Sequence, residues 1–295
     1  ETVAEAPSRM NRAGYGEMTS MYVAPADWRL AALLGIDPTY HRGPVALLEA
    51  LGPRLDACAG GVATGEPQAV QELTWALALR GIATGVAGTT ACLSGVEHLV
   101  SHMLDLRAAE LGLPTGLHGE QVGAGSVVAA CAWELLNDRL STHADARVLD
   151  IALDPKRAES RVRAAFDQLD PTGRIGAECW RDYSRKLERV SAARGTIDRV
   201  VAQWSTHAST VLDLARPSDV IARGLRSAGS PALISDLVED VPADAARWAV
   251  AHCALMRDRF TVIDLLTVLG WWEDSDIDEV HARVQRAVAA SEVLA

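Results

Sequence analysis

Three of the eight histidines in this chain lie close together in the segment 94–125, which makes it a candidate for metal chemistry. His98 and His102 are four positions apart, so on a helix they would share one face. His118 follows a connection that contains proline and glycine. Neutral imidazole is a common ligand of divalent metals, and a metal site needs ligands that converge from separate segments. The alternative is that His98 lies in the core and His102 on the surface, and the spacing alone leaves both open.

A metal site of this kind usually completes its ligand set with a carboxylate. The best candidate is Glu17 in RAGYGEM, because Gly14 and Gly16 before it allow the backbone to turn tightly. Glu17 also opens a predicted helix, where a carboxylate is stabilised by the positive helix end. Without the histidines, such an N-terminal helix charge would be the preferred interpretation of Glu17.

Composition limits the class of protein. The 295 residues are 49% hydrophobic, and 39 acidic residues against 28 basic ones give a formal net charge of -11. This charge argues against partners such as nucleic acid or an anionic membrane surface, although it does not exclude a small anionic substrate.

Cysteine usage and hydropathy predict a cytoplasmic protein. The five cysteines (Cys58, Cys92, Cys131, Cys179, Cys253) show no C-x-x-C spacing, which favours reduced and mostly buried thiols. The sequence shows no apolar run long enough to span a bilayer and no signal peptide at its start.

Helical periodicity and the scarcity of alternating β-branched segments predict an all-α fold. We expect residues 1–295 to form a single all-helical metal and substrate domain, with the metal-ligand helices in 1–140 and C-terminal helices in 141–295. The helix in 67–82 is apolar nearly all round, which predicts a central position, and Gly60–Gly61 before it predicts a loop. Small residues in the helix 119–140 would let another backbone or a metal site approach closely.

Five segments in order carry a resemblance to a known family: RAGYGEMTSMYVAPADWRLA, SGVEHLVSHMLD, LHGEQVGAG, ECWRDYSRKLE and MRDRFTVIDLLTVLG. Together they resemble the C-terminal helical domain of sn-glycerol-1-phosphate dehydrogenases. These proteins share a superfamily with iron-type alcohol dehydrogenases, glycerol dehydrogenases and dehydroquinate synthases. The resemblance spans nearly the whole chain, and it implies the multi-helix metal-binding domain of that superfamily.

The resemblance also implies roles for single residues. Matched by motif, Glu17, His98 and His118 would be the metal ligands, and His102 would be a catalytic residue beside the metal and near the nicotinamide or the substrate. The implied cofactors are a divalent metal, with zinc first and nickel or iron as alternatives, and NAD(P). The dinucleotide would bind mainly to an N-terminal α/β domain, so we assign no cofactor-binding residue here.

The implied activity is an NAD(P)-linked reduction of a dihydroxyacetone-phosphate-like ketone, in which the metal polarises the carbonyl group. The substrate would be a small phosphorylated ketone or polyol. We expect the nucleotide-binding domain to be absent from this chain, because its glycine-rich turn is missing and Gly60–Gly61 follows no strand pattern. The chain alone would then be inactive. Partners left open are a second copy in a homodimer and a separate nucleotide-binding domain.

Two other functions compete with this one. The dehydrogenases usually carry aspartate where this chain has Glu17, whereas sugar-phosphate cyclases of the dehydroquinate synthase type carry glutamate in an AEVIK-like motif. Here Met18, Thr19 and Ser20 follow, so the cyclase lysine is missing. The other alternative is a non-catalytic helical module that lacks the cofactor domain. Arg257 and Arg259 could contact a substrate phosphate, but a surface pair or salt bridges is the favoured interpretation.

Overall fold

A computed structural model describes residues 5–143, 145–238 and 240–293 of the chain. Regular secondary structure in these residues is entirely helical, which confirms the predicted all-α fold. The α-helices are α1 (Ser8–Met18), α2 (Ala24–Leu33), α3 (Arg42–Glu49), α4 (Gly52–Thr64), α5 (Pro67–Ala87), α6 (Val96–Leu111), α7 (His118–Thr142), α8 (Pro155–Phe166), α9 (Arg174–Ala202), α10 (Trp204–Leu212), α11 (Ser218–Ser227), α12 (Ala243–His252), α13 (Val262–Val268) and α14 (Asp274–Val293). Short 3-10 helices connect some of them: η1 (Thr19–Tyr22), η2 (Thr90–Leu93), η3 (Asp150–Leu153), η4 (Ile234–Asp236) and η5 (Cys253–Leu255). Among the described helices, none has the length and apolar character that a membrane span requires.

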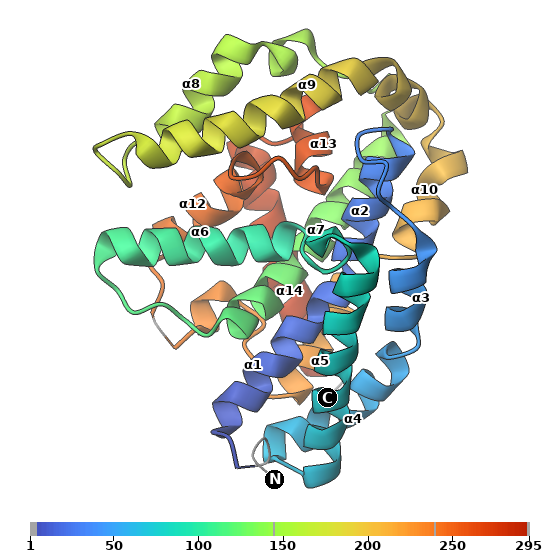
Figure 1. Cartoon of the computed structure of the whole chain (residues 1–295), viewed down its shortest axis with the longest axis vertical. Coiled ribbons are helices and arrows are strands. Elements are labelled where there is room, and N and C mark those ends of the chain that lie inside the picture. The colour runs from blue at the N-terminus through green and yellow to red at the C-terminus, as the bar shows by residue number, and fades with distance from the viewer. Residues whose placement is uncertain (1–4, 144, 239, 294–295) are drawn as a thin grey trace.

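Helix α7 forms the centre of this fold. Its side chains are buried along most of its length. Helices α1, α6 and α14 pack around it (Figure 1), and α11 packs against it as well. Helices α11 and α14 come from the C-terminal part of the chain, and their apolar side chains join the same hydrophobic core as those of the N-terminal helices. The division into ligand helices and C-terminal helices stays a prediction.

The predicted central position of the helix in 67–82 is wrong. Helix α5, which contains this segment, keeps Trp75, Ile82 and Val86 exposed at 52%, 55% and 51%. A helix that is apolar all round carries no information about which face is buried. Packing is decided instead by the small residues of α7, which let neighbouring helices approach from several sides.

Glycines in α1 and α7 allow this close approach. The two helices cross where Gly16 faces Gly119, and a Cβ atom on either glycine would overlap a backbone carbonyl group of the other helix. Further along α7, a Cβ atom on Gly125 would lie only 2.8 Å from the carbonyl oxygen of Glu97 in α6. The expectation that small residues in 119–140 let other backbones approach is therefore confirmed.

Two other glycine predictions are wrong. Gly60 and Gly61 lie inside α4 rather than in a loop. Gly14 and Gly16 lie inside α1, which continues through them to Met18. The prediction that Glu17 opens a helix is therefore also wrong, because Glu17 lies in the last turn of α1 and not at a positive helix end. An interior glycine costs a helix only about 1 kcal/mol relative to alanine, and tertiary packing offsets this. At Gly61 the reason is visible, because a Cβ atom there would lie 2.5 Å from the Cβ atom of Ala69 in α5.

The five cysteines behave as predicted from their spacing. All of them are buried and none forms a disulfide bond. Burial raises the pKa of the Cys131 thiol to about 12 and that of the Cys179 thiol to about 11. Both therefore act as small apolar groups in the core rather than as nucleophiles.

The crossing of α1 and α7 gives the first testable prediction. Gly119→Ala should lower the free energy of unfolding by about 1–3 kcal/mol, because the new methyl group must push α1 away from α7. Gly85→Ala is the matched control, since Gly85 is an exposed interior residue of α5 with open space around it. The control should raise stability by about 0.5–1 kcal/mol. Urea unfolding followed by circular dichroism measures both, and equal effects of the two changes would contradict the crossing.

Candidate metal centre

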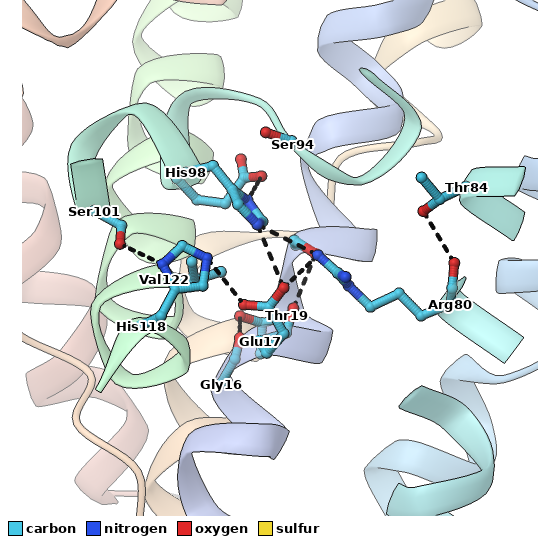
Figure 2. A network of polar contacts seen from close by, with 12 residues as sticks. Gly16, Glu17, Thr19, Arg80, Thr84, Ser94, His98, Ser101, His118 and Val122 are labelled. Carbon is cyan, nitrogen blue, oxygen red and sulfur yellow. Dashed lines mark hydrogen bonds and ion pairs between the residues drawn. The ribbon is translucent and has the colours of Figure 1, made fainter. Parts of the chain in front are cut away.

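Glu17, His98 and His118 converge at one point although they lie on three different helices. Glu17 is near the end of α1, His98 is in the first turn of α6, and His118 is the first residue of α7 (Figure 2). His98 Nε2 lies 3.4 Å from Glu17 Oε1, and His118 Nε2 lies 3.6 Å from Glu17 Oε2. Each residue offers one ligand atom, and these atoms all lie within 4.8 Å of one another. The structure therefore brings together the three residues that the sequence selected.

The buried carboxylate of Glu97 orients the His98 ring. His98 Nδ1 lies 2.9 Å from Glu97 Oε1, and the same oxygen accepts a hydrogen bond of 2.7 Å from the backbone N–H of Gly95. Since a carboxylate only accepts, the proton between them belongs to Nδ1. The lone pair of His98 Nε2 then faces Glu17. A carboxylate behind the ligand nitrogen is the usual outer partner of a metal-binding histidine.

A series of hydrogen bonds orients the ring of His118 as Glu97 orients that of His98, with Nδ1 engaged and Nε2 toward Glu17. Ser101 Oγ donates to Gln121 Oε1 at 2.7 Å, and Gln121 Nε2 donates to Asp105 Oδ1 at 2.9 Å. His118 Nδ1 lies 2.9 Å from Ser101 Oγ. A hydroxyl group has a single proton, and here it is already donated to Gln121, so Ser101 must accept from His118 Nδ1–H. Nε2 of His118 is therefore also left with its lone pair facing Glu17.

A buried aspartate holds the start of α6 in place. Asp27 in α2 is fully buried and accepts hydrogen bonds from the backbone N–H of Val96 at 3.2 Å and from that of Val262 at 2.9 Å. Its complete burial and the nearby Glu97 carboxylate raise its pKa well above the usual value, despite these two donors. The carboxyl group thus ties the first turn of α6 to the first turn of α13.

Arg259 secures the loop before α6. Its guanidinium group donates to the carbonyl and hydroxyl oxygens of Ser94 and to Thr90 Oγ1, the last at 2.6 Å. These contacts join the segment that precedes α13 to the loop that leads into α6 and His98. Arg259 therefore has a structural role in this fold.

The charges of the three residues are coupled. Burial raises the pKa of Glu17, but protonated His98, which can donate a hydrogen bond to it, and the charges of Arg80 and His118 outweigh burial, so the pKa lies below its usual value. Burial lowers the pKa of His98, but the Glu17 and Glu97 carboxylates more than compensate and the net pKa is raised. For His118, burial prevails over the attraction of Glu17 and the pKa is lowered. Glu17 is thus an ionised carboxylate between two imidazoles.

His102 lies beside this group but outside it. Its ring is stacked on that of His118, with the ring centroids 5.7 Å apart. Burial, followed by the charges of His118, His98 and Arg257, lowers the pKa of His102, so its ring is neutral near pH 7. One side of His102 borders a cavity of about 360 Å³, whose wall also contains the exposed Arg257.

Sequence reasoning missed the residues that support the ligands. Glu97 and Ser101 lie within SGVEHLVSH, and Gln121 lies within LHGEQ, the motifs from which only the histidines were selected. Their polar side chains in otherwise apolar helix starts were the available signal. Arg80 was also missed. Its Nη2 contacts Glu17 Oε1 directly and lies 3.3 Å from His98 Nε2, and its only signal was a charge within an apolar helix.

The hydrogen-bond pattern predicts the tautomers of both histidines. His98 and His118 should carry their ring proton on Nδ1 in the neutral protein, which long-range ¹H–¹⁵N correlation spectra can detect. Ser101→Ala removes the acceptor of the His118 proton and should shift the His118 nitrogens while leaving those of His98 unchanged. His207 in α10, which carries none of these contacts, serves as the internal reference. Detection of the Nε2–H form at both rings would contradict the assignment.

Comparison with known proteins adds to this geometry. No family model matches the chain. Curated proteins named glycerol-1-phosphate dehydrogenase [NAD(P)+] do match it. The protein of Aeropyrum pernix is 36% identical over 131 residues, which are 44% of this chain and 36% of that protein. The protein of Natronomonas pharaonis is 31% identical over 58% of this chain and 49% of its own length.

A third relative shows how far the similarity extends along the chain. The Bacillus licheniformis protein of the same name is 23% identical over 92% of this chain and 52% of its own length. The chain thus spans about half the length of the curated relatives it matches, or less. The resemblance inferred from the motifs is confirmed: this chain is similar to glycerol-1-phosphate dehydrogenases along most of its length.

Proposed function

We propose that Glu17, His98 and His118 bind a divalent metal, and that the chain is the metal- and substrate-binding part of an NAD(P)-linked dehydrogenase. Its substrate would be a small phosphorylated ketone similar to dihydroxyacetone phosphate. The observation that supports this most is the convergence of the three donors, each on a different helix, within 4.8 Å of one another. The similarity to proteins named glycerol-1-phosphate dehydrogenase [NAD(P)+] supports the class of reaction.

The residues present fit a divalent cation. One carboxylate and two imidazoles are a common donor set for zinc and for related transition metals. Glu17 Oε2 is buried and has no hydrogen-bond partner, which is costly unless a cation or another donor compensates. Both imidazoles have their Nδ1 atoms engaged and their Nε2 lone pairs directed at Glu17. Zinc is the first choice among the metals, with nickel and iron as alternatives.

The chain's own residues would bind and orient the ketone. A divalent metal held by Glu17, His98 and His118 supplies Lewis-acid polarisation of a substrate carbonyl group. His102, neutral beside His118, can exchange a hydrogen bond with a substrate hydroxyl group in the adjoining cavity. Hydride would come from NAD(P)H, and the protein's contribution is to place the ketone for that transfer.

Arg257 is the residue that would contact the phosphate group. The sequence alone favoured a surface or salt-bridge role, but the structure places Arg257 on the wall of the cavity that begins at His102. The same wall contains Asp105 and Glu178, which already have partners in Gln121 and Arg181. A guanidinium group binds phosphate in a bidentate manner. A phosphorylated ketone could therefore extend from the metal toward Arg257.

Metal content tests the first part of this proposal. Protein stripped with a chelator and reloaded with zinc should hold about one equivalent per chain, because the donor set makes a single site. Glu17→Ala and His118→Ala should each abolish stoichiometric uptake, and His207→Ala in α10 is the matched control that should retain it. Elemental analysis by mass spectrometry measures all four proteins. If the wild type holds no stoichiometric zinc, and the zinc content of the Glu17→Ala and His118→Ala variants equals that of the wild type, the site is not a metal centre.

Ligand binding tests the second part. Zinc-loaded protein should bind dihydroxyacetone phosphate in calorimetry, and Arg257→Met should weaken this binding roughly tenfold to hundredfold by removing a charged hydrogen-bond donor. Arg199→Met, on the exposed surface of α9, is the matched control. Unphosphorylated dihydroxyacetone should not distinguish wild type from Arg257→Met. Equal affinity of both proteins for the phosphorylated ketone would exclude Arg257 from the phosphate site.

The cyclase alternative rests on Glu17, which matches the residue type of that branch. Incubation with a heptulosonate phosphate separates the two reactions, since a cyclase of the dehydroquinate synthase type releases inorganic phosphate. The dehydrogenase instead consumes NADH or NADPH in the presence of dihydroxyacetone phosphate. Phosphate release without oxidation of the dinucleotide would favour the cyclase.

A further inference from the structure

Arg80 of α5 reaches into the proposed metal centre. Figure 2 shows its side chain approaching Glu17 and His98 from the side away from His118. Its Nη2 contacts Glu17 Oε1 and lies 3.3 Å from His98 Nε2. The Arg80 side chain is 22% exposed and that of Glu17 is 16% exposed, so this contact is largely shielded from water.

The contact uses the atoms that a metal would need. A guanidinium group has only donors, so at His98 Nε2 it must face the lone pair. An imidazole nitrogen has one lone pair, which cannot serve an N–H donor and a metal ion at once. The carboxylate oxygen Oε1 of Glu17 is engaged by the same Nη2 atom. Arg80 and a cation therefore exclude each other at His98, and Arg80 also engages one of the two carboxylate oxygens of Glu17.

His118 Nε2 and the second carboxylate oxygen of Glu17, Oε2, lie on the side away from Arg80. Glu17 Oε2 and His118 Nε2 lie 3.6 Å apart, and neither makes a contact with Arg80 that would occupy it. A cation can thus approach from the His118 side, but it completes its ligand set only when the guanidinium group moves away. If Arg80 stayed, the divalent cation would lie next to its guanidinium group in a partly buried place, where repulsion between like charges is stronger than in water.

Arg80 has a route by which to leave. It lies on a helix whose neighbouring residues Gly81 and Ile82 are exposed, and space around Gly81 is open. Its Nε atom is buried without a partner, so the side chain is held mainly at its end. Long arginine side chains readily place their charged end in water.

We propose that Arg80 is an internal competitor of the metal, which lowers the affinity of the site and must be displaced when the cation binds. This inference rests on the proposed metal centre and adds a residue that controls it. The contact also explains how the buried carboxylate of Glu17 can be compensated by the protein itself, since an unpaired buried charge is costly. Such a site would bind metal reversibly rather than permanently.

Zinc affinity of the intact chain tests the inference without reference to activity. Wild type, Arg80→Met and Arg80→Gln are titrated with zinc against a chromogenic chelator, at one pH and one ionic strength. Removal of the guanidinium group should tighten zinc binding roughly tenfold to hundredfold, because the cation then no longer has to break a charge-assisted contact. Arg80→Lys, which keeps the positive charge, should stay closer to the wild type than either neutral variant.

Arg54→Met is the matched control. Arg54 in α4 forms an ion pair of 2.6 Å with Glu72 of α5, so the change removes the same charge from a neighbouring ion pair outside the centre. It should leave zinc affinity unchanged. Thermal unfolding with a chelator present verifies that each variant is folded. If one of the two neutral variants, Arg80→Met or Arg80→Gln, does not fold, the other still allows the test.

The outcomes separate the inference from the metal centre on which it rests. If zinc binds the wild type and both neutral variants with equal affinity, or binds the variants more weakly, Arg80 is not a competitor although the centre stands. If neither wild type nor the neutral variants take up zinc, the centre and the inference both fail. Zinc binding by the wild type that is measurable but weaker than that of both neutral variants would establish the competition.

Discussion

The close crossing of α1, α6 and α7 is the constraint on which the rest of the structure depends. Gly16 and Gly119 let two backbones meet without side chains between them, and Gly125 does the same for α6. Interiors are packed too tightly to absorb an added methyl group at such points. Because Glu17 follows Gly16 and His118 precedes Gly119, the helix crossing and the proposed metal centre are one feature of the molecule.

Polar groups behind the histidines convert this crossing into a site with defined geometry. Glu97 and Ser101 hold the Nδ1 atoms of two imidazoles, and Asp27 anchors the helix on which His98 lies. A buried network of this kind is stable only when each member has partners, and it then restricts its members to a single arrangement. Preorganised ligands also reduce the conformational cost of binding a cation. The supporting residues thus belong to the proposed site together with the ligands.

Much of the fold and the site could be predicted from the sequence. Helical periodicity indicated the all-α class, and the motifs around Glu17, His98 and His118 selected three residues that do converge. Glycine positions were harder to interpret, because the same residue that permits a loop also permits two helices to touch. Gly61 was therefore assigned to a loop although it lies in α4 against α5. The exposed face of α5 was missed because hydrophobicity without periodicity does not indicate which side is buried.

The sequence by itself determined which residue types were available for chemistry, since donor atoms and helical spacing are properties of the local chain. Only the tertiary structure decided which of them meet. It brought Ser101 and Gln121 together behind His118 and placed Arg257 at the cavity beside His102. It also brought Arg80 into contact with Glu17, which lies 63 positions earlier in the chain. Such contacts depend on how helices cross, and crossing is set by the packing of many side chains at once rather than by any local pattern.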